Sequence, residues 1–183
     1  MSFPSFARSH AIRTSWLLAL AAILWLPVSV AAENPSFTGE WVLVPEKSKN
    51  LGALTGSTQW LKFDAGSLTI ARKVDFVEQE KPMEYEYVYV VDGEEHLVKD
   101  PTGLSGPEGK GQRQTKAEWT GWGGRKLEAE WSFYAKPFTI KVVETWRPKG
   151  KDLEIEREFS GAPVDIPGHK HYYKRAQPKG DDS

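Results

Sequence analysis

Three charged residues stand where the alternation of apolar side chains predicts an inward direction. Arg72, Glu144 and Arg157 each share the phase of the apolar residues in their own predicted strand. A buried charge is costly unless it is paired, so each of them needs a partner. One interpretation is a salt bridge between Glu144 and Arg157 on neighbouring antiparallel strands, or a bulge that turns one of them outward. The other is an anchor for the charged end of a ligand.

Aromatic residues follow the same alternation. Tyrosine occupies three alternate positions of the segment 83–91, and a tryptophan shares the apolar face of the segment 125–134. Buried tyrosine and tryptophan carry an O–H or N–H that can bind a ligand, but these residues also fill cores. Packing is therefore the alternative role for each of them. The candidate ligand-binding residues are Arg72, Tyr85, Tyr87, Tyr89, Trp131, Glu144 and Arg157.

Metal binding and catalysis find less support. His169 and His171 are two apart on a predicted strand and can supply two metal ligands, but a third would have to be a carboxylate because cysteine is absent. No nucleophile stands beside a base, and the glutamates of 127–131 and 153–159 alternate with apolar residues, which is typical of a solvated outer face. We predict no catalytic residue, no metal and no cofactor, with an enzyme kept as an alternative.

The elements that position these residues are strands. From Phe37 onward the hydrophobic period is two, and the short runs end at Gly, Pro, Asp or Asn. Asp64-Ala-Gly66, Asp92-Gly93, Gly123-Gly124 and Pro148-Lys-Gly150 mark hairpin turns. The predicted strands are 38–44, 58–63, 67–75, 83–91, 94–99, 116–120, 125–134, 138–147, 152–159 and 170–175, with loops at 47–57 and 101–114.

Strands that pair with their sequence neighbours form a meander. An open meander leaves two exposed edges, and closure into a barrel removes them. No long amphipathic helix pattern interrupts the strands. The predicted fold is therefore all-β, a single antiparallel meander closed into a barrel of about eight to ten strands.

The first 32 residues have the features of an export signal. Arg8 and Arg13 precede an apolar run from Trp16 to Leu26, and small residues at 30–32 provide a cleavage site. An uncleaved membrane anchor is the alternative, but Pro27 ends the run short of the roughly 20 residues that a spanning helix needs. We expect an exported protein, periplasmic or secreted, without stable membrane insertion after cleavage.

The remaining chain suits one domain. Cleavage removes two of the 24 basic residues and none of the 25 acidic ones, which leaves 151 residues with a net charge of −3. We predict one barrel domain over 33–176 and a disordered tail over 177–183. The basic residues are dispersed, which argues against a nucleic-acid partner, and the absence of cysteine excludes a disulfide framework. We expect a monomer.

A short motif opens the mature chain. Gly39 and Trp41 form a Gly-x-Trp at the head of the first strand, and the chain ends its last strand with Lys174 and Arg175. The pattern resembles lipocalins, in which the motif lies at the closed end of the barrel under a basic side chain from the last strand. The resemblance implies a structural role for Gly39, Trp41 and Arg175, or Lys174 in its place.

The wider pattern covers most of residues 37–176. Pro45, Lys47 and Ser48 follow the motif, an Asp-Gly hairpin lies mid-chain, and Tyr172 to Arg175 end the strands. This is similar to the small exported lipocalin-like proteins of bacteria, in the calycin superfamily, although a helix after the barrel and a cysteine pair are missing. The resemblance implies a small apolar or amphipathic ligand, held as in the fatty-acid-binding branch by inward Arg and Tyr. A barrel filled by its own side chains, acting as an interaction module of the cell envelope, is the alternative.

Overall fold

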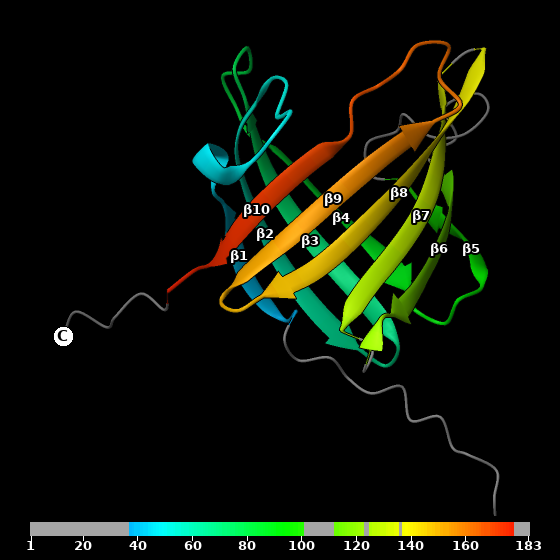
Figure 1. Cartoon of the computed structure of the whole chain (residues 1–183), viewed down its shortest axis with the longest axis horizontal. Helices are drawn as coiled ribbons and strands as arrows, with labels where there is room; N and C mark the ends of the chain where they lie inside the picture. Colours follow the sequence, from blue (N-terminus) through cyan, green and yellow to red (C-terminus); the bar gives the residue numbers. More distant parts are fainter. Residues whose placement is uncertain (1–36, 101–111, 123–124, 136, 178–183) are drawn as a thin grey trace, which may run out of the picture. The chain divides into compact units, whose positions relative to one another are not determined.

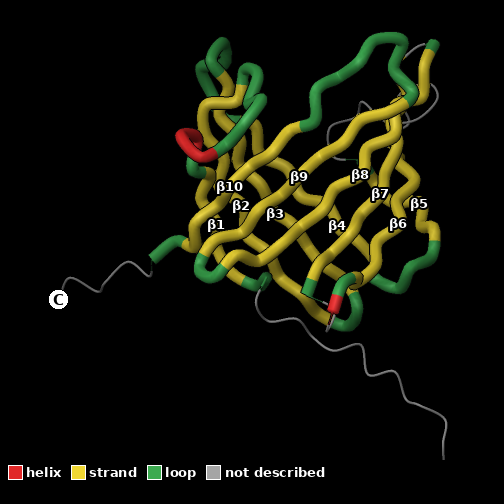
Figure 2. Tube along the Cα trace, in the orientation of Figure 1, coloured by secondary structure: helices red, strands yellow, loops and turns green. Residues whose placement is uncertain are grey.

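The computed structural model describes residues 37–100, 112–122, 125–135 and 137–177. The described chain contains ten strands and one short helix, so it is mostly strand with almost no helix (Figures 1 and 2). The elements are β1 (Gly39–Leu43), η1 (Pro45–Lys47), β2 (Leu54–Asp64), β3 (Ser67–Phe76), β4 (Met83–Val90), β5 (Glu95–Lys99), β6 (Gln112–Thr120), β7 (Lys126–Ala135), β8 (Phe138–Lys149), β9 (Asp152–Ser160) and β10 (His169–Arg175). The predicted all-β meander is confirmed.

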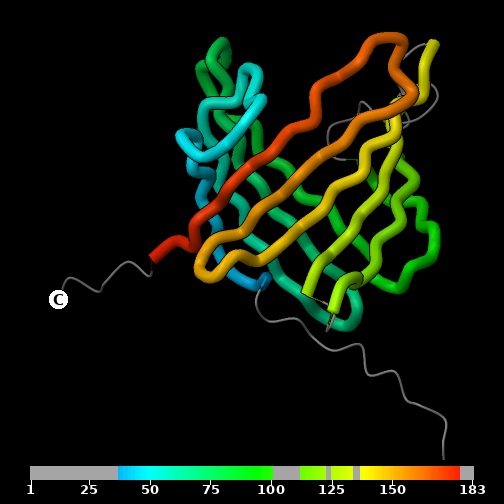
Figure 3. The backbone as a smooth tube through the Cα atoms, in the orientation of Figure 1, coloured from blue at the N-terminus to red at the C-terminus, as the bar shows by residue number. Residues whose placement is uncertain are grey.

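All ten strands belong to one antiparallel sheet, in the order β4-β3-β2-β1-β10-β9-β8-β7-β6-β5. Each strand follows its sequence neighbour, and β1 pairs with β10, so the sheet curls into a nearly closed barrel (Figure 3). Just after β4, an isolated bridge joins Val91 to Ala117 on β6, and the Gly93 N–H donates to Ala117 O at 2.9 Å. The barrel therefore keeps a seam beside β4 where the sequence predicted full closure.

Two strands begin earlier than the sequence predicted. β2 starts at Leu54 and β6 at Gln112, so the predicted loops 47–57 and 101–114 are shorter than expected. The turn predictions at 64–66, 93 and 150 are confirmed by positive φ angles at Ala65, Gly66, Gly93 and Gly150. The predicted turn at 123–124, the signal segment, most of the tail and 101–111 lie outside the described residues.

The Gly-x-Trp motif forms the base of the barrel. Trp41 pairs directly with Arg175 in the β1–β10 register, and the guanidinium carbon of Arg175 lies 4.6 Å from the centre of a Trp41 ring. Trp41 Nε1 donates to Phe37 O at 2.9 Å, and Arg175 Nη1 donates to Thr38 O at 2.8 Å. Between the two candidate cations, the structure thus selects Arg175 over Lys174. This cation–π contact and its hydrogen bonds hold the entering chain against the last strand.

Gly39 is required by this arrangement. Its φ is +135°, which side chains rarely adopt, and a Cβ placed there would lie 2.7 Å from Arg175 Nη1. The guanidinium therefore occupies the space that glycine leaves open.

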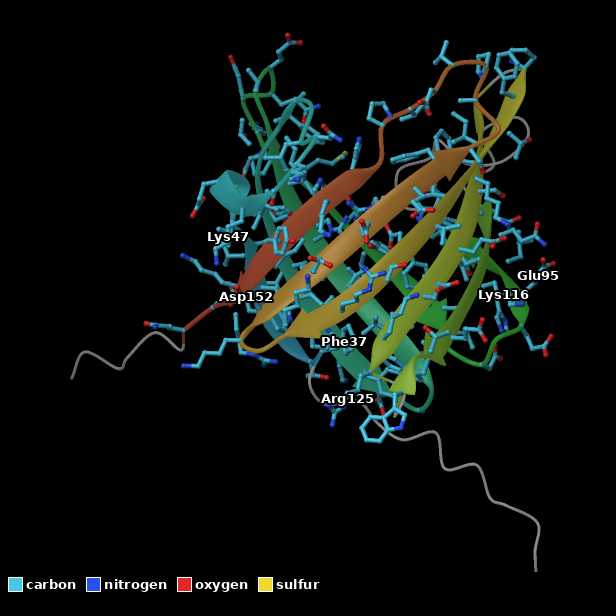
Figure 4. All side chains as sticks on the ribbon, viewed as in Figure 1. Phe37, Lys47, Glu95, Lys116, Arg125 and Asp152 are labelled. Atoms are coloured by element: carbon cyan, nitrogen blue, oxygen red, sulfur yellow. The ribbon has the colours of Figure 1, made fainter. Side chains whose placement is uncertain are left out.

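We call this end of the barrel the closed end, because aromatic side chains fill it. Phe37 is fully buried and packs on Trp119 at 5.2 Å between ring centres, and Phe63 packs on the same indole at 5.5 Å. Figure 4 places Phe37 and Arg125 toward this lower end of the barrel. Above them, the closed half of the interior is packed solid by Leu68, Ile70, Tyr89, Leu127, Trp146, Leu153, Ile155 and Tyr173.

The opposite end, which we call the open end, carries the β3–β4 turn and the β9–β10 connection. Met83 and Phe138, which share the inward phase of the apolar residues in their strands, lie near this rim with 37% and 39% of their surfaces exposed. They begin β4 and β8, where the pleat no longer has a packed interior to face. No helix in the described part of the chain is long and apolar enough to cross a membrane.

Candidate functional site: a polar layer beneath an aromatic cavity

A layer of polar side chains crosses the barrel interior above the packed closed half. We call it the polar layer; its residues are Gln59, Arg72, Tyr87, Arg113, Glu144, Arg157 and His171, all buried. They come from β2, β3, β4, β6, β8, β9 and β10, so almost every wall of the barrel contributes to it. Each of these side chains except Arg113 lies two residues along its strand from a buried apolar or aromatic residue of the closed half, and both point inward.

Glu144 and Arg157 form an ion pair at the centre of one wall. They are direct partners in the β8–β9 register, and Arg157 Nε donates to Glu144 Oε1 at 2.6 Å. Tyr89 Oη and Trp146 Nε1 each donate to Glu144 Oε2 at 3.0 Å. Burial opposes the charge of Glu144, but the guanidiniums of Arg157 and Arg72 outweigh it and lower the pKa of the carboxyl to about 2. The carboxylate is therefore ionised, and its oxygens are well supplied with donors.

Arg72 occupies the opposite wall. It pairs with Gln59 in the β2–β3 register, and its Nη2 donates to Gln59 Oε1 at 2.8 Å. Its guanidinium also lies 5.9 Å from the ring centre of Tyr87. Burial alone would lower the pKa of Arg72, yet the phenols of Tyr87 and Tyr85 and the Glu144 carboxylate raise it. Arg72 stays charged inside the barrel.

Arg113 is a site residue that the sequence reasoning missed. It lies on β6 with its guanidinium 4.5 Å from the ring centre of Tyr87, 4.9 Å from that of Trp131 and 5.6 Å from that of Tyr89. The prediction placed residue 113 in a glycine-rich loop, because both faces of the segment 112–116 are polar and show no phase. The structure extends β6 back to Gln112, which turns Arg113 inward.

His171 completes the layer as a neutral imidazole. Its Nδ1 lies 3.0 Å from Arg157 Nη1, and because a guanidinium only donates, Nδ1 must accept and the proton must sit on Nε2. Burial and the charges of Arg157 and Arg72 lower the pKa of His171 to about 3. His171 therefore adds an N–H donor to the layer and no charge at neutral pH.

The layer holds more donors than acceptors. Within the described residues, seven buried side-chain nitrogens around the layer have no hydrogen-bond partner: Gln59 Nε2, Arg72 Nε, Arg113 Nε, Arg113 Nη2, Trp131 Nε1, Arg157 Nη2 and His171 Nε2. Every one of them is an N–H donor, since Gln59 already accepts through its oxygen and His171 through Nδ1. Buried donors are nearly always paired in proteins. These donors therefore lack an acceptor among the residues that the structure describes.

The buried charges also indicate a missing negative group. Among the described side chains inside the barrel, three buried guanidiniums, those of Arg72, Arg113 and Arg157, face two buried carboxylates, those of Asp100 and Glu144. One positive charge is left over in a region shielded from water. A single negative charge from outside would balance it.

A cavity of about 250 Å³ opens directly above the polar layer. Its apolar wall consists of the aromatic residues Tyr85, Tyr87, Trp131 and Phe159, and its polar wall consists of Arg72, Asp100, Arg113, Glu144 and Arg157. Six of the seven predicted ligand-binding residues therefore line this cavity. The seventh, Tyr89, lies beneath it as a hydrogen-bond donor to Glu144. The motif residues Gly39, Trp41 and Arg175 lie at the closed end, away from this cavity.

The two histidines of β10 do not gather a metal site. His169 stacks on His171 at 5.8 Å and meets the Phe159 ring at 4.9 Å. Across the residues that the structure describes, no group of three or more His, Cys, Asp or Glu side chains is arranged to hold a metal ion.

No protein-family model matches this chain, and no curated protein matches it in sequence. Solved structures do match. Fatty-acid-binding protein 1 from Echinococcus granulosus has a TM-score of 0.51 at 11% identity, over 78% of this chain and 98% of that chain. The zebrafish ileal bile acid-binding protein complexed with cholic acid has a TM-score of 0.52 at 12% identity, over 77% and 99%. A secretary abundant heat soluble (SAHS) protein from Ramazzottius varieornatus has a TM-score of 0.50 at 15% identity, over 77% and 96%.

The chain shares the antiparallel β-barrel fold of these solved structures. At these identities the likeness concerns the fold, and the barrels agree over nearly the whole length of the solved chains. What the interior of this barrel does must be argued from its own residues.

Proposed function

We propose that the protein binds a small amphipathic organic anion inside its barrel. The observation that carries the proposal is the set of seven buried N–H donors without partners around the polar layer. Leaving a buried donor unpaired costs about 1–3 kcal/mol, so a ligand that supplies acceptor oxygens gains from each donor that it reaches. A carboxylate or sulfonate supplies such oxygens together with the negative charge that the layer lacks.

The rest of the ligand would be apolar. The upper cavity wall is built from four aromatic side chains, and burial of apolar surface against them stabilises a bound ligand by roughly 25 cal/mol per Å². Solved neighbours named as a fatty-acid-binding and a bile acid-binding protein support a barrel of this type holding an amphipathic molecule. Inward Arg and Tyr side chains would serve the polar end, as the resemblance to the fatty-acid-binding branch implies.

The two alternatives are less well supported. An interaction module with a side-chain-filled barrel fits the closed half, but a cavity of about 250 Å³ remains above the polar layer. An enzyme would need a base whose pKa lies near the working pH. Glu144, the buried carboxylate of the ion pair, has a pKa of about 2 and is engaged by three donors, which suits charge balance rather than proton transfer.

Binding of 1-anilinonaphthalene-8-sulfonate, a fluorescent aromatic anion, tests the proposal. The wild-type protein should bind the probe with enhanced fluorescence, and Arg113→Met should weaken binding at least about 10-fold, since charge-assisted hydrogen bonds contribute about 1.5–3 kcal/mol. Arg125→Met is the matched control, because Arg125 lies on the exposed β6–β7 turn. Circular dichroism of each variant verifies the fold. Failure of the wild type to bind any organic anion would refute the proposal.

We further propose that the protein works as an exported monomer, periplasmic or secreted. Support comes from the basic, apolar and small-residue pattern of the first 32 residues. The native protein purified from envelope or culture fractions should begin at Glu33, or at Ala32 if cleavage falls one residue earlier. N-terminal sequencing that returned Met1 from those fractions would contradict export by cleavage, and light scattering in solution would decide the oligomeric state.

A further inference from the structure

The cavity above the polar layer is small for a lipid. Pockets that enclose drug-sized ligands have volumes of about 300–1,000 Å³. The volume here is about 250 Å³, below that range. A ligand enclosed in it must therefore be compact.

Buried side chains of the described residues occupy the space between the cavity and the closed end of the barrel. Beneath the polar layer, Leu68, Leu153 and Ile155 are completely buried, and Tyr89 and Trp146 close the remaining space around Glu144. A long alkyl chain anchored at the layer would have to leave through the open end. Each methylene that stays in water gains nothing, whereas each buried one would contribute about 0.8 kcal/mol, or about fourfold in affinity.

Arg113 presents a ready edge for a carboxylate. Its Nε and Nη2 are both buried and without partners among the described residues, and these two atoms form the side edge of the guanidinium. A carboxylate binds such an edge through two parallel hydrogen bonds in the plane of the guanidinium. The edge thus fixes the plane of the ligand's carboxylate as well as its position.

Aromatic rings surround the Arg113 guanidinium. The Arg113 guanidinium lies over both Tyr87 and Trp131, at 4.5 Å and 4.9 Å from their ring centres. In an aryl or arylvinyl acid the ring is conjugated with the carboxylate and shares its plane. Such a ligand, with its carboxylate on the Arg113 edge, would place its ring near Tyr87 and Trp131, where aromatic pairs gain beyond their buried area.

We propose that the ligand is a compact planar aromatic monocarboxylate, bound through the open edge of Arg113, in preference to a long-chain fatty acid. This inference rests on the proposed function and names the class of anion. The cavity volume limits the length of the ligand, and the aromatic walls favour a flat ligand. The one surplus positive charge among the described buried side chains favours a single carboxylate.

A matched set of ligands tests the inference by isothermal titration calorimetry on the wild-type protein. Cinnamate, 3-cyclohexylpropionate and nonanoate share carbon number and charge but differ in flatness; cinnamamide lacks the charge, and palmitate is longer. Cinnamate should bind about 3- to 10-fold more tightly than either non-planar acid. Cinnamamide should bind at least about 10-fold more weakly than cinnamate. Palmitate should bind no more tightly than nonanoate.

Two outcomes distinguish failure of the aromatic preference from failure of the proposed anion binding. Palmitate binding much more tightly than nonanoate and cinnamate would overturn the aromatic preference and leave anion binding intact. Absence of binding by every acid in the set would overturn the proposed function itself.

Variants of two tryptophans give an independent readout. Trp131→Leu should reduce the preference for cinnamate over nonanoate towards unity, because it removes an aromatic wall without changing charge. Trp122→Leu is the control, since that indole is 90% exposed on the β6–β7 turn, and it should leave the preference unchanged. An undiminished preference in folded Trp131→Leu would overturn the assignment of this wall; if that variant does not fold, the wild-type series decides.

Discussion

Glu144 receives hydrogen bonds from one cation, Arg157, and from two neutral donors. Replacing Arg157 by leucine would strand the carboxylate in the interior, so Arg157→Leu should lower the free energy of unfolding by about 3–5 kcal/mol. The double variant Glu144→Gln, Arg157→Leu should recover much of that loss, because it removes both charges of the ion pair together. Urea denaturation of the wild type, both single variants and the double variant measures the coupling. A loss below about 1 kcal/mol in Arg157→Leu would contradict a buried pair.

Replacement of Trp41 tests whether the closed end stabilises the barrel. Trp41 is 2% exposed; its indole N–H donates to the Phe37 carbonyl, and the Arg175 guanidinium lies over its ring. Trp41→Ala should lower the free energy of unfolding by roughly 3–5 kcal/mol, as large-to-small core changes do. Trp122→Ala, at an exposed position, should change it by no more than about 0.5 kcal/mol. Similar denaturation midpoints for the two variants would mean that the motif does not carry the base of the barrel.

Single-residue prediction from the sequence succeeded where a charge interrupts an apolar phase. Arg72, Glu144 and Arg157 stand out against apolar neighbours, and all three lie inside the barrel. Arg113 has polar neighbours on both faces of its strand, so alternation carries no information there. His171 was recognised by its spacing to His169, but its role as a neutral donor depends on Arg157, which lies on the neighbouring strand.

Elements were predicted better at their turns than at their starts. Gly and Asp mark the hairpins, and all ten strands exist close to the expected places. The starts of β2 and β6 lie in polar, glycine-rich sequence, and they become strand because β3 and β5 offer backbone partners there. Pairing across the sheet overrides weak local preference.

The outer face of β8, β9 and β10 corrects another expectation. Glu154 was predicted to be solvated, but only 1% of it is exposed, because Lys149, Arg147 and Lys170 surround its carboxylate at 2.6, 3.4 and 3.4 Å. Burial opposes its charge, but the hydrogen bond from Lys149 and the neighbouring cations lower the pKa of Glu154 to about 2. This carboxylate therefore ties three strands together from outside the barrel.

The contribution of Glu154 should exceed that of an ordinary surface ion pair. Glu154→Gln should lower the free energy of unfolding by more than about 1 kcal/mol, the upper value for exposed pairs, and by less than about 3 kcal/mol. Glu156→Gln is the matched control on the same strand, because Glu156 contacts Arg147 and Lys170 but is more exposed. Its effect should stay below about 1 kcal/mol. Equal effects in urea denaturation would show that the covered position of Glu154 adds nothing.

For the whole molecule, the sequence predicted architecture but not interior volume. A meander of about eight to ten strands was expected, and ten strands form the nearly closed barrel. Whether such a barrel is hollow depends on how side chains from opposite walls meet, and strand number alone permits a filled interior or a small cavity. The structure combines both: a packed closed half and a cavity of about 250 Å³ above the polar layer. Long-range packing of this kind leaves no periodic signal in the chain.

The polar layer also makes the stability of the whole barrel depend on pH. In the folded state the pKa of His171 lies at about 3, whereas its ordinary value is 6.5, because burial and the nearby arginines disfavour the imidazolium. The pKa of Glu144 lies at about 2 against 4.5, because Arg157 and Arg72 outweigh burial and favour the carboxylate. In both cases the unfolded chain takes up the proton at a higher pH than the folded barrel. Acid therefore stabilises the unfolded state, and the two groups lose their contributions in different pH windows.

The free energy of unfolding should consequently be insensitive to these two groups above pH 6.5, fall between pH 6.5 and about 3 through His171, and fall further from pH 4.5 to about 2 through Glu144. The slope contributed by one proton is at most about 1.4 kcal/mol per pH unit. In His171→Asn, whose amide oxygen can still accept from Arg157, the slope between pH 6.5 and 4.5 should become shallower by up to that amount. The Glu144 window should remain, and a comparison at pH 8 isolates any packing cost of the substitution. Urea denaturation across this range provides the measurement, and an unchanged slope in His171→Asn would show that the imidazole is not held neutral in the layer.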